Sequence, residues 1–141
     1  MTNAISGFGS KLNWDGADIA ELTNISGPTQ SVETIDVTSH DSADAYREFI
    51  AALLSGGDIS LEGNFISGDT AGQIAMHTDF QARTVKNWII KFPEWVTSSH
   101  EYPQLSGAGL VTAFEFTFPS DNKIGFTATI KVSGKPTLAL A

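Results

Sequence analysis

The chain has 141 residues and a mass of 15.0 kDa, contains no cysteine, and carries a formal net charge of −8. The missing thiols exclude a disulfide framework and a cysteine-ligated zinc site, and no apolar run reaches the roughly eighteen residues of a membrane span, so no membrane insertion is expected. Residues 1–4 lack the basic and apolar regions that start a signal peptide, so none is expected. We expect one domain over residues 1–141, made in a cytoplasm.

The charge is unevenly distributed along the chain. Residues 1–70 hold eleven acids and two bases, a net charge of −9, whereas residues 71–141 hold five acids and six bases. A protein that binds nucleic acid needs a basic surface to displace the counterions of the phosphates. Because acids outnumber bases in this chain, a large nucleic-acid interface is excluded. Mild acidity is also usual among soluble proteins.

Strands are predicted over most of the first half of the chain. Alternating apolar and polar residues, bounded by the turn residues Asp15-Gly16 and Ser26-Gly27-Pro28, favour short strands. The expected strands are Lys11–Trp14, Ile19–Ile25, Glu33–Thr38 and Ile59–Phe65.

Two segments have the spacing of helices. Over Ala43–Leu54 the apolar residues recur every three or four positions, and Gly56-Gly57 follows, which would end a helix. The apolar stripe there needs a partner in the same subunit or in another one. A further helix is predicted over residues 70–83, where Thr70 and Gln73 have the spacing of a capping box.

A long hairpin is predicted over residues 108–133. Apolar residues alternate from Leu110 to Phe118 and again from Ile124 to Val132, on both sides of the turn Pro119–Asn122. Before it, Val85–Phe92 is β-rich and stops at Pro93. The sequence therefore predicts a mainly β fold, sandwich-like or barrel-like, with one packed helix.

Six short sequence segments, taken in their order along the chain, resemble those of the major tail tube proteins of long, non-contractile-tailed bacteriophages. The segments are GFGSKL at 7–12, IAELTNISGP at 19–28, ETIDVTSHDS at 33–42, YREFIA at 46–51, GGDISLEGNF at 56–65 and IKVSGKP at 130–136. The resemblance implies a β-sandwich with one helix and no enzymatic activity or cofactor. It also implies a virion protein whose hexameric rings stack into a tail tube, the conduit for DNA during ejection. Some relatives carry an additional C-terminal immunoglobulin-like domain, which we do not expect here.

The same resemblance implies partners and contact residues. The partners would be further copies of the chain and the tail-tip initiator, tape-measure and tail-terminator proteins, assembled in the host cytoplasm, while double-stranded DNA passes without specific binding. A long segment after the third strand would contact the adjacent ring; its expected contact residues are Thr38, Asp41, Tyr46, Phe49, Ile50 and Leu53. The solvent-exposed faces of strands would line the lumen; the residues expected there are Asp36, Glu62, Glu115, Thr117 and Thr127.

Other functions have weaker support in the residues. His40, Asp41 and Asp44, or His77 and Asp79, could suggest a metal site, but their spacing matches no ligand motif, so none is expected. No nucleophile elbow or phosphate loop is present, and three tryptophans, Trp14, Trp88 and Trp95, favour core or interface positions over a sugar site. The alternatives to a tail tube are a non-enzymatic β-sandwich binding module and the tube of a contractile injection system.

Overall fold

The computed structural model describes residues 6–93 and 103–140. In chain order its elements are β1 Lys11–Trp14, β2 Ala17–Asp18, β3 Leu22–Ser26, β4 Ser31–Asp36, the 3-10 turn η1 Ala43–Ala45, β5 Phe49–Ser55, β6 Asp58–Asn64, α1 Gln73–Ala82, β7 Lys86–Lys91, β8 Pro103–Thr117 and β9 Gly125–Leu140. The mainly β prediction with one packed helix is therefore confirmed.

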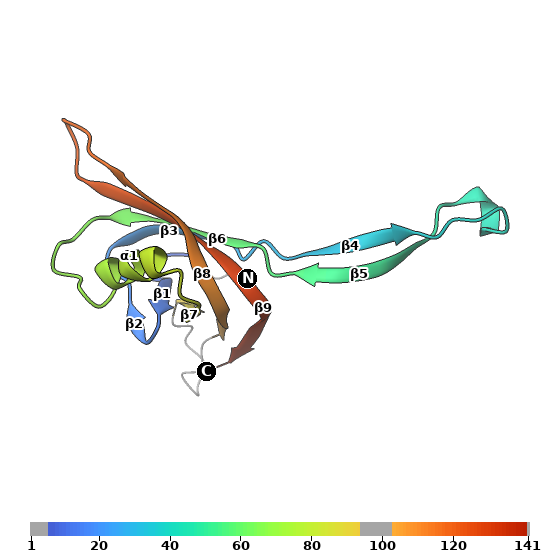
Figure 1. The fold of residues 1–141 in the computed structure, drawn as a ribbon, viewed down its shortest axis with the longest axis horizontal. Helices are drawn as coiled ribbons and strands as arrows, with labels where there is room; N and C mark the ends of the chain where they lie inside the picture. The colour runs from blue at the N-terminus through green and yellow to red at the C-terminus, as the bar shows by residue number, and fades with distance from the viewer. Residues whose placement is uncertain (1–5, 94–102, 141) are drawn as a thin grey trace.

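Seven of the strands form one antiparallel sheet in the order β2-β1-β7-β8-β9-β6-β3. The sheet curls so strongly that β1 and β3, near its two ends, come close to each other. We call this curled sheet with α1 the body. The two remaining strands, β4 and β5, pair only with each other and project from the body as a long ribbon (Figure 1).

The predicted C-terminal hairpin is confirmed and is longer than expected, because β8 and β9 remain paired from Thr117 and Gly125 to Pro103 and Leu140. One detail of the predicted alternation is wrong. A register shift between Val111 and Ala113 places Val111 in the core, whereas Leu110 is only half-buried. A β-bulge of this kind moves side chains to the other face of the sheet.

The core lies inside the curl of the sheet and is covered on one side by α1 (Figure 1). The predicted core positions of Trp14 and Trp88 are confirmed, since both are almost fully buried; Trp95 lies outside the described residues. Each indole N–H is satisfied, that of Trp14 by Asp79 Oδ2 at 2.8 Å and that of Trp88 by the Ala108 carbonyl oxygen at 3.1 Å. Buried indoles need such acceptors.

The start of α1 differs from the predicted capping box. The N-cap is Gly72, and Asp69 Oδ2 accepts the hydrogen bond from the Gln73 N–H at 3.0 Å. The Gln73 carboxamide instead points inward and is 1% exposed. Its Nε2 donates to the carbonyl oxygens of Ala20 and Asn64, both at 2.8 Å, and so joins the helix to the turn before β3 and to the end of β6.

The predicted helix over Ala43–Leu54 is wrong. Only one 3-10 turn forms there, in which Asp44 and Ala45 have positive φ, a conformation that cannot continue a right-handed helix. Residues Phe49–Ser55 are a strand because their backbone pairs with Ser31–Asp36. Pairing with a β-branched partner strand overrides the helical propensity of the alanines and leucines.

Candidate assembly surfaces

The projecting β4–β5 hairpin is the most apolar exposed part of the molecule. Of the fourteen large hydrophobic side chains exposed among the described residues, eight lie between residues 31 and 55. They are Val32, Ile35, Val37, Tyr46, Phe49, Ile50, Leu53 and Leu54. A monomer rarely leaves such a surface in water, so this hairpin has the composition of an interface.

All six residues predicted to contact a neighbouring ring lie on this hairpin. Phe49, Ile50 and Leu53 belong to β5, and Thr38, Asp41 and Tyr46 lie in the connection at the far end of the ribbon. The structure therefore brings these residues into one projecting unit, although it replaces the expected helix by a strand pair.

Local polar bonds fix the outer end of the hairpin. The Thr38 Oγ1 accepts a hydrogen bond from the Glu48 N–H at 2.8 Å, which closes the strand pair. Hydrogen bonding from Thr38, through its side chain and its N–H, holds the pKa of the Asp36 carboxyl below its ordinary value. Ser42 Oγ donates to Glu48 Oε2 at 2.9 Å. The end of the ribbon thus has a defined shape.

Close backbone packing fixes the base of the hairpin. Gly57 has a φ of +71°, and a Cβ atom there would overlap the Thr29 carbonyl oxygen. The Val132 N–H donates to the Gly57 carbonyl oxygen at 2.9 Å and ties the base to β9. Only glycine fits this junction without displacing the chain.

A row of exposed polar side chains crosses the outer face of the body. Glu62 on β6 is paired with Thr127 on β9, and Thr127 is paired with Glu115 on β8, so three of the predicted lumen residues are direct neighbours. Thr117 lies on the same face, two residues beyond Glu115. Asp36, the fifth predicted residue, is not in this group, because it lies on the β4–β5 hairpin.

The outer face around this row is polar and mildly acidic. Its strand positions on β6, β8 and β9, from Asp58 to Asn64 and their partners, hold three acids and one base: Asp58, Glu62, Glu115 and Lys131. Lys131 Nζ lies 3.8 Å from Asp58 Oδ1, so the base is already opposed by a carboxylate. Such a face repels phosphates more than it attracts them.

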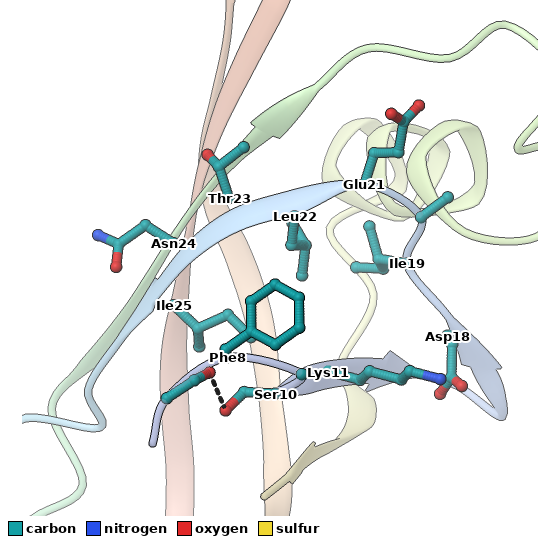
Figure 2. A pocket seen from close by; sticks show the side chains of 13 residues that line it. Phe8, Ser10, Lys11, Asp18, Ile19, Glu21, Leu22, Thr23, Asn24 and Ile25 are labelled. Atoms are coloured by element: carbon teal, nitrogen blue, oxygen red, sulfur yellow. Dashed lines mark hydrogen bonds between the residues drawn. The ribbon is translucent and has the colours of Figure 1, made fainter. Parts of the chain in front are cut away.

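A cleft of about 770 Å³ lies between the segment Gly7–Lys11 and the chain from Asp18 to Ile25. Figure 2 shows the Phe8 ring beside Leu22 and Ile25, with Lys11 and Asp18 near each other at one end. Ser10 Oγ donates to the Gly7 carbonyl oxygen at 2.9 Å, which folds this segment on itself. The cleft is lined by apolar side chains such as Phe8, Ile19 and Leu22, together with one cation, Lys11, and two acids, Asp18 and Glu21.

The candidate metal ligands are engaged elsewhere or far apart. Asp79 accepts the bond from Trp14, and His77 packs edge-on against Phe114 at 5.2 Å between ring centroids. His40, Asp41 and Asp44 lie on the hairpin. No cluster of three potential ligands occurs within residues 6–93 and 103–140, and no helix in those ranges is long and apolar enough to cross a membrane.

The sequence as a whole matches one family model, described as "Lambda phage tail tube protein, TTP", over residues 4–139. The match covers nearly the entire chain and includes both the projecting hairpin and the body. The chain belongs to the lambda phage tail tube protein family. It is therefore a structural component of a phage tail tube, part of the tail of the virion, as the resemblance of its sequence segments indicated. No curated protein sequence matches this tail tube protein.

Solved structures show the same fold. A chain of the virion of a native gene transfer agent particle has a TM-score of 0.75 and 21% identity, with 96% of this chain and 99% of that chain covered. A chain of the tail of an empty gene transfer agent particle, computed with C6 symmetry, gives 0.70 and 22%, with 92% and 93% covered. The SPP1 tail tube gives 0.71 and 10%, with 96% and 78% covered.

Sequence reasoning missed the residues that fix the hairpin base and the helix start of this tail tube protein. Gly57 was expected to end a helix, and its actual role depends on the Thr29 carbonyl, which lies far away in sequence. Gln73 was expected to cap a helix by its spacing, although it is a buried residue whose side chain donates to the turn before β3 and to the end of β6. The doublet Gly56-Gly57 indicated an unusual backbone conformation, but it gave no indication that Thr29 would pack against it.

Proposed function

We propose that this tail tube protein assembles with copies of itself into stacked hexameric rings, and that the resulting tube conducts phage DNA during ejection. The family match, and the C6 symmetry of a gene transfer agent tail whose chain has the same fold, support this arrangement. The match to the lambda family supports the non-contractile type over the tube of a contractile injection system. In this role the protein needs neither catalysis nor a cofactor.

The observation that carries the proposal is the β4–β5 hairpin. It exposes apolar side chains far from the core and has a defined end and a rigid base, features that suit contact with the adjacent ring. Thr38, Asp41, Tyr46, Phe49, Ile50 and Leu53 are the residues that we assign to this contact. A heterologous contact, made by one patch on a different patch, repeats without limit along a stack.

The outer face of β6, β9 and β8 is the surface that we assign to the lumen. Glu62, Thr127, Glu115 and Thr117 lie together there, and the three acids and one base of this face would give each ring a net negative wall. A conduit gains from this charge because each cation that contacts a phosphate adds affinity and slows transit. Asp36 belongs to the hairpin contact in this arrangement rather than to the wall.

The complete tail would add other proteins at both ends and inside the tube. A tail-tip initiator, a tape-measure protein and a tail terminator are the partners that we assign, and the tube would be built in the host cytoplasm.

Negative-stain electron microscopy tests the proposal directly. The purified protein, concentrated or mixed with its tail-tip complex, is expected to form rings or tubes with sixfold end views. Sedimentation velocity should show the matching loss of monomer. Only monomers under both conditions would contradict the proposal. A monomer that binds a sugar or another small ligand in the cleft at Phe8 would instead support a binding module.

A further inference from the structure

The β4–β5 hairpin is apolar on both of its faces. Successive side chains of a strand point to opposite faces, and directly paired residues share a face. The pairs Val32 with Leu54 and Asp36 with Phe49 therefore lie on one face, which we call face A. The pair Ile35 with Ile50 lies on the other, face B.

The register shift in the ribbon also assigns Leu53 to face B. Between the pairs Val32–Leu54 and Thr34–Ala51, β5 has two residues where β4 has only Glu33. A β-bulge of this type has one extra residue and places both Ala52 and Leu53 opposite the single partner Glu33, so Leu53 points away from Leu54. The two adjacent leucines are 81% and 82% exposed.

Both faces are similarly exposed along the ribbon. On face A, Val32 and Phe49 are 46% and 54% exposed, and on face B, Ile35 and Ile50 are 50% and 51% exposed. A ribbon that lies on a single surface needs only one apolar face and keeps a polar face toward water. A two-stranded ribbon with two apolar faces is also marginally stable when it is isolated in water.

From this pattern we infer that the hairpin inserts between two neighbouring copies of the chain and is covered on both faces. This inference rests on the proposed function and names the partners of the hairpin. The ribbon projects from the body with both sides open (Figure 1), so a single flat surface could cover only one of them. In a ring of identical subunits, the seam between two neighbours offers two surfaces to a hairpin from the adjacent ring.

Charge supports a second copy as the occupant on each side. Residues 31–55 hold five acids and one base, a net charge of −4. Among the described residues, Lys11, Arg83, Lys123 and Lys135 make no ion pair, so the body of a copy has cations available to oppose the acidic hairpin. Opposite charges of this kind guide two copies into register.

The adjacent leucines provide a matched test. Leu53→Ser removes an apolar side chain from face B and Leu54→Ser removes the same side chain from face A. Because both leucines are exposed in the free chain, neither change should alter the melting temperature of the monomer. Each should raise the protein concentration needed for tube growth about tenfold or more, since each loses a buried leucine contact in the tube. Phe49→Ser and Ile50→Ser repeat the comparison at the outer half of the ribbon.

A thiol reagent gives a second readout that needs no loss of assembly. The chain contains no cysteine, so Leu53→Cys and Leu54→Cys each introduce a single reactive thiol. We expect both thiols to react rapidly in the monomer and at least tenfold more slowly in assembled tubes.

The outcomes separate this inference from the proposed function. An unmodified chain that forms no ring or tube would contradict the proposed function itself. The insertion would be overturned if only one of the two serine variants impaired tube growth and only the thiol at that same position were protected in tubes. The hairpin would then contact a neighbour through one face. Tubes in which both thiols stay reactive would also overturn the insertion, because neither face of the hairpin would then be covered by copies of the chain.

Discussion

The body and the β4–β5 hairpin use the same kinds of apolar residues with opposite results. In the body, Trp14, Trp88 and Phe126 are at most 1% exposed and lie inside a curled sheet. In the hairpin, Phe49 and Leu53 are more than half exposed, because two strands cannot enclose a core. The difference indicates that burial in the body stabilises the single chain, whereas burial of the hairpin takes place on assembly. Substitutions in the two regions should therefore act on different equilibria.

The largest effect on the free chain is expected from Trp88→Ala. Trp88 is fully buried and its indole N–H is bonded to Ala108, so the change leaves a cavity in the middle of the sheet. The free energy of unfolding should fall by about 3–5 kcal/mol, measured by urea denaturation. A loss below about 1 kcal/mol would mean that the body is packed less tightly around Trp88 than its burial indicates.

Phe49→Ala should have the reverse profile. The side chain is 54% exposed and contributes nothing to the body, so the unfolding free energy of the monomer should change by less than about 0.5 kcal/mol. Tube growth should be blocked or greatly slowed, as followed by light scattering and electron microscopy. If Phe49→Ala unfolds the monomer, the hairpin is ordinary core and the contrast between the two regions fails.

Gly57→Ala tests the junction between the two regions. The new Cβ atom would overlap the Thr29 carbonyl oxygen at a residue with positive φ, which should cost about 1–3 kcal/mol and redirect the hairpin. Gly16→Ala is the matched control, because Gly16 also has positive φ but open space around it. Tube growth should suffer more from Gly57→Ala. Equal effects of the two changes would show that only backbone strain matters.

Glu115→Lys should leave both folding and tube growth unchanged, since the side chain is exposed on the outer face of the body. If this face lines the lumen, DNA release from assembled particles should be slower, and more so at low ionic strength. Glu21→Lys makes the same charge change at an exposed residue outside the row and should not slow release. Equal release times for the two variants at low salt would remove Glu115 from the wall.

The smallest effect is expected at the edge of the body. Burial opposes ionisation of Asp18, but hydrogen bonds from Lys91 and Asn13 outweigh it and hold the pKa of this carboxyl below its ordinary value of 3.8. The ionised form therefore stabilises the fold above that value, and the contribution is lost as the pH falls through the lowered pKa. Lys91→Gln should cost less than about 1 kcal/mol at neutral pH and nothing in strong acid, as measured by denaturation at both pH values. A cost that persists in acid would show a packing role for Lys91.

The sequence predicted the body well because its patterns are local. Alternation identified the strands that became β1, β3, β6 and β7 and the long pair β8–β9. Three of the residues expected to line the lumen, Glu62, Thr127 and Glu115, lie in one row across this sheet. Turn residues such as Asp15-Gly16 mark the boundaries within one or two positions. These signals depend only on nearby residues.

The sequence could not predict features that depend on distant partners. Leucines and alanines in Phe49–Ser55 suit a helix by spacing, and only pairing with Ser31–Asp36 makes them a strand. The bulge at Thr112 that turns Val111 inward is set by the register with β9, and the burial of Gln73 is set by the carbonyl groups of Ala20 and Asn64. The large apolar side chains of Ala43–Leu54 are exposed in the single chain, and their need for a partner stays a prediction.

Hydrogen exchange of the free chain and of assembled tubes tests the division of roles most directly. In the free chain, amides of the paired core strands β8 and β9 should exchange slowly and those of β4 and β5 much faster, because a two-stranded ribbon opens easily. On assembly, the amides of residues 31–36 and 49–55 should become strongly protected, while the core strands change little. Hairpin amides that are equally protected in both states, or that stay unprotected in tubes, would contradict the claim that this region is built for assembly.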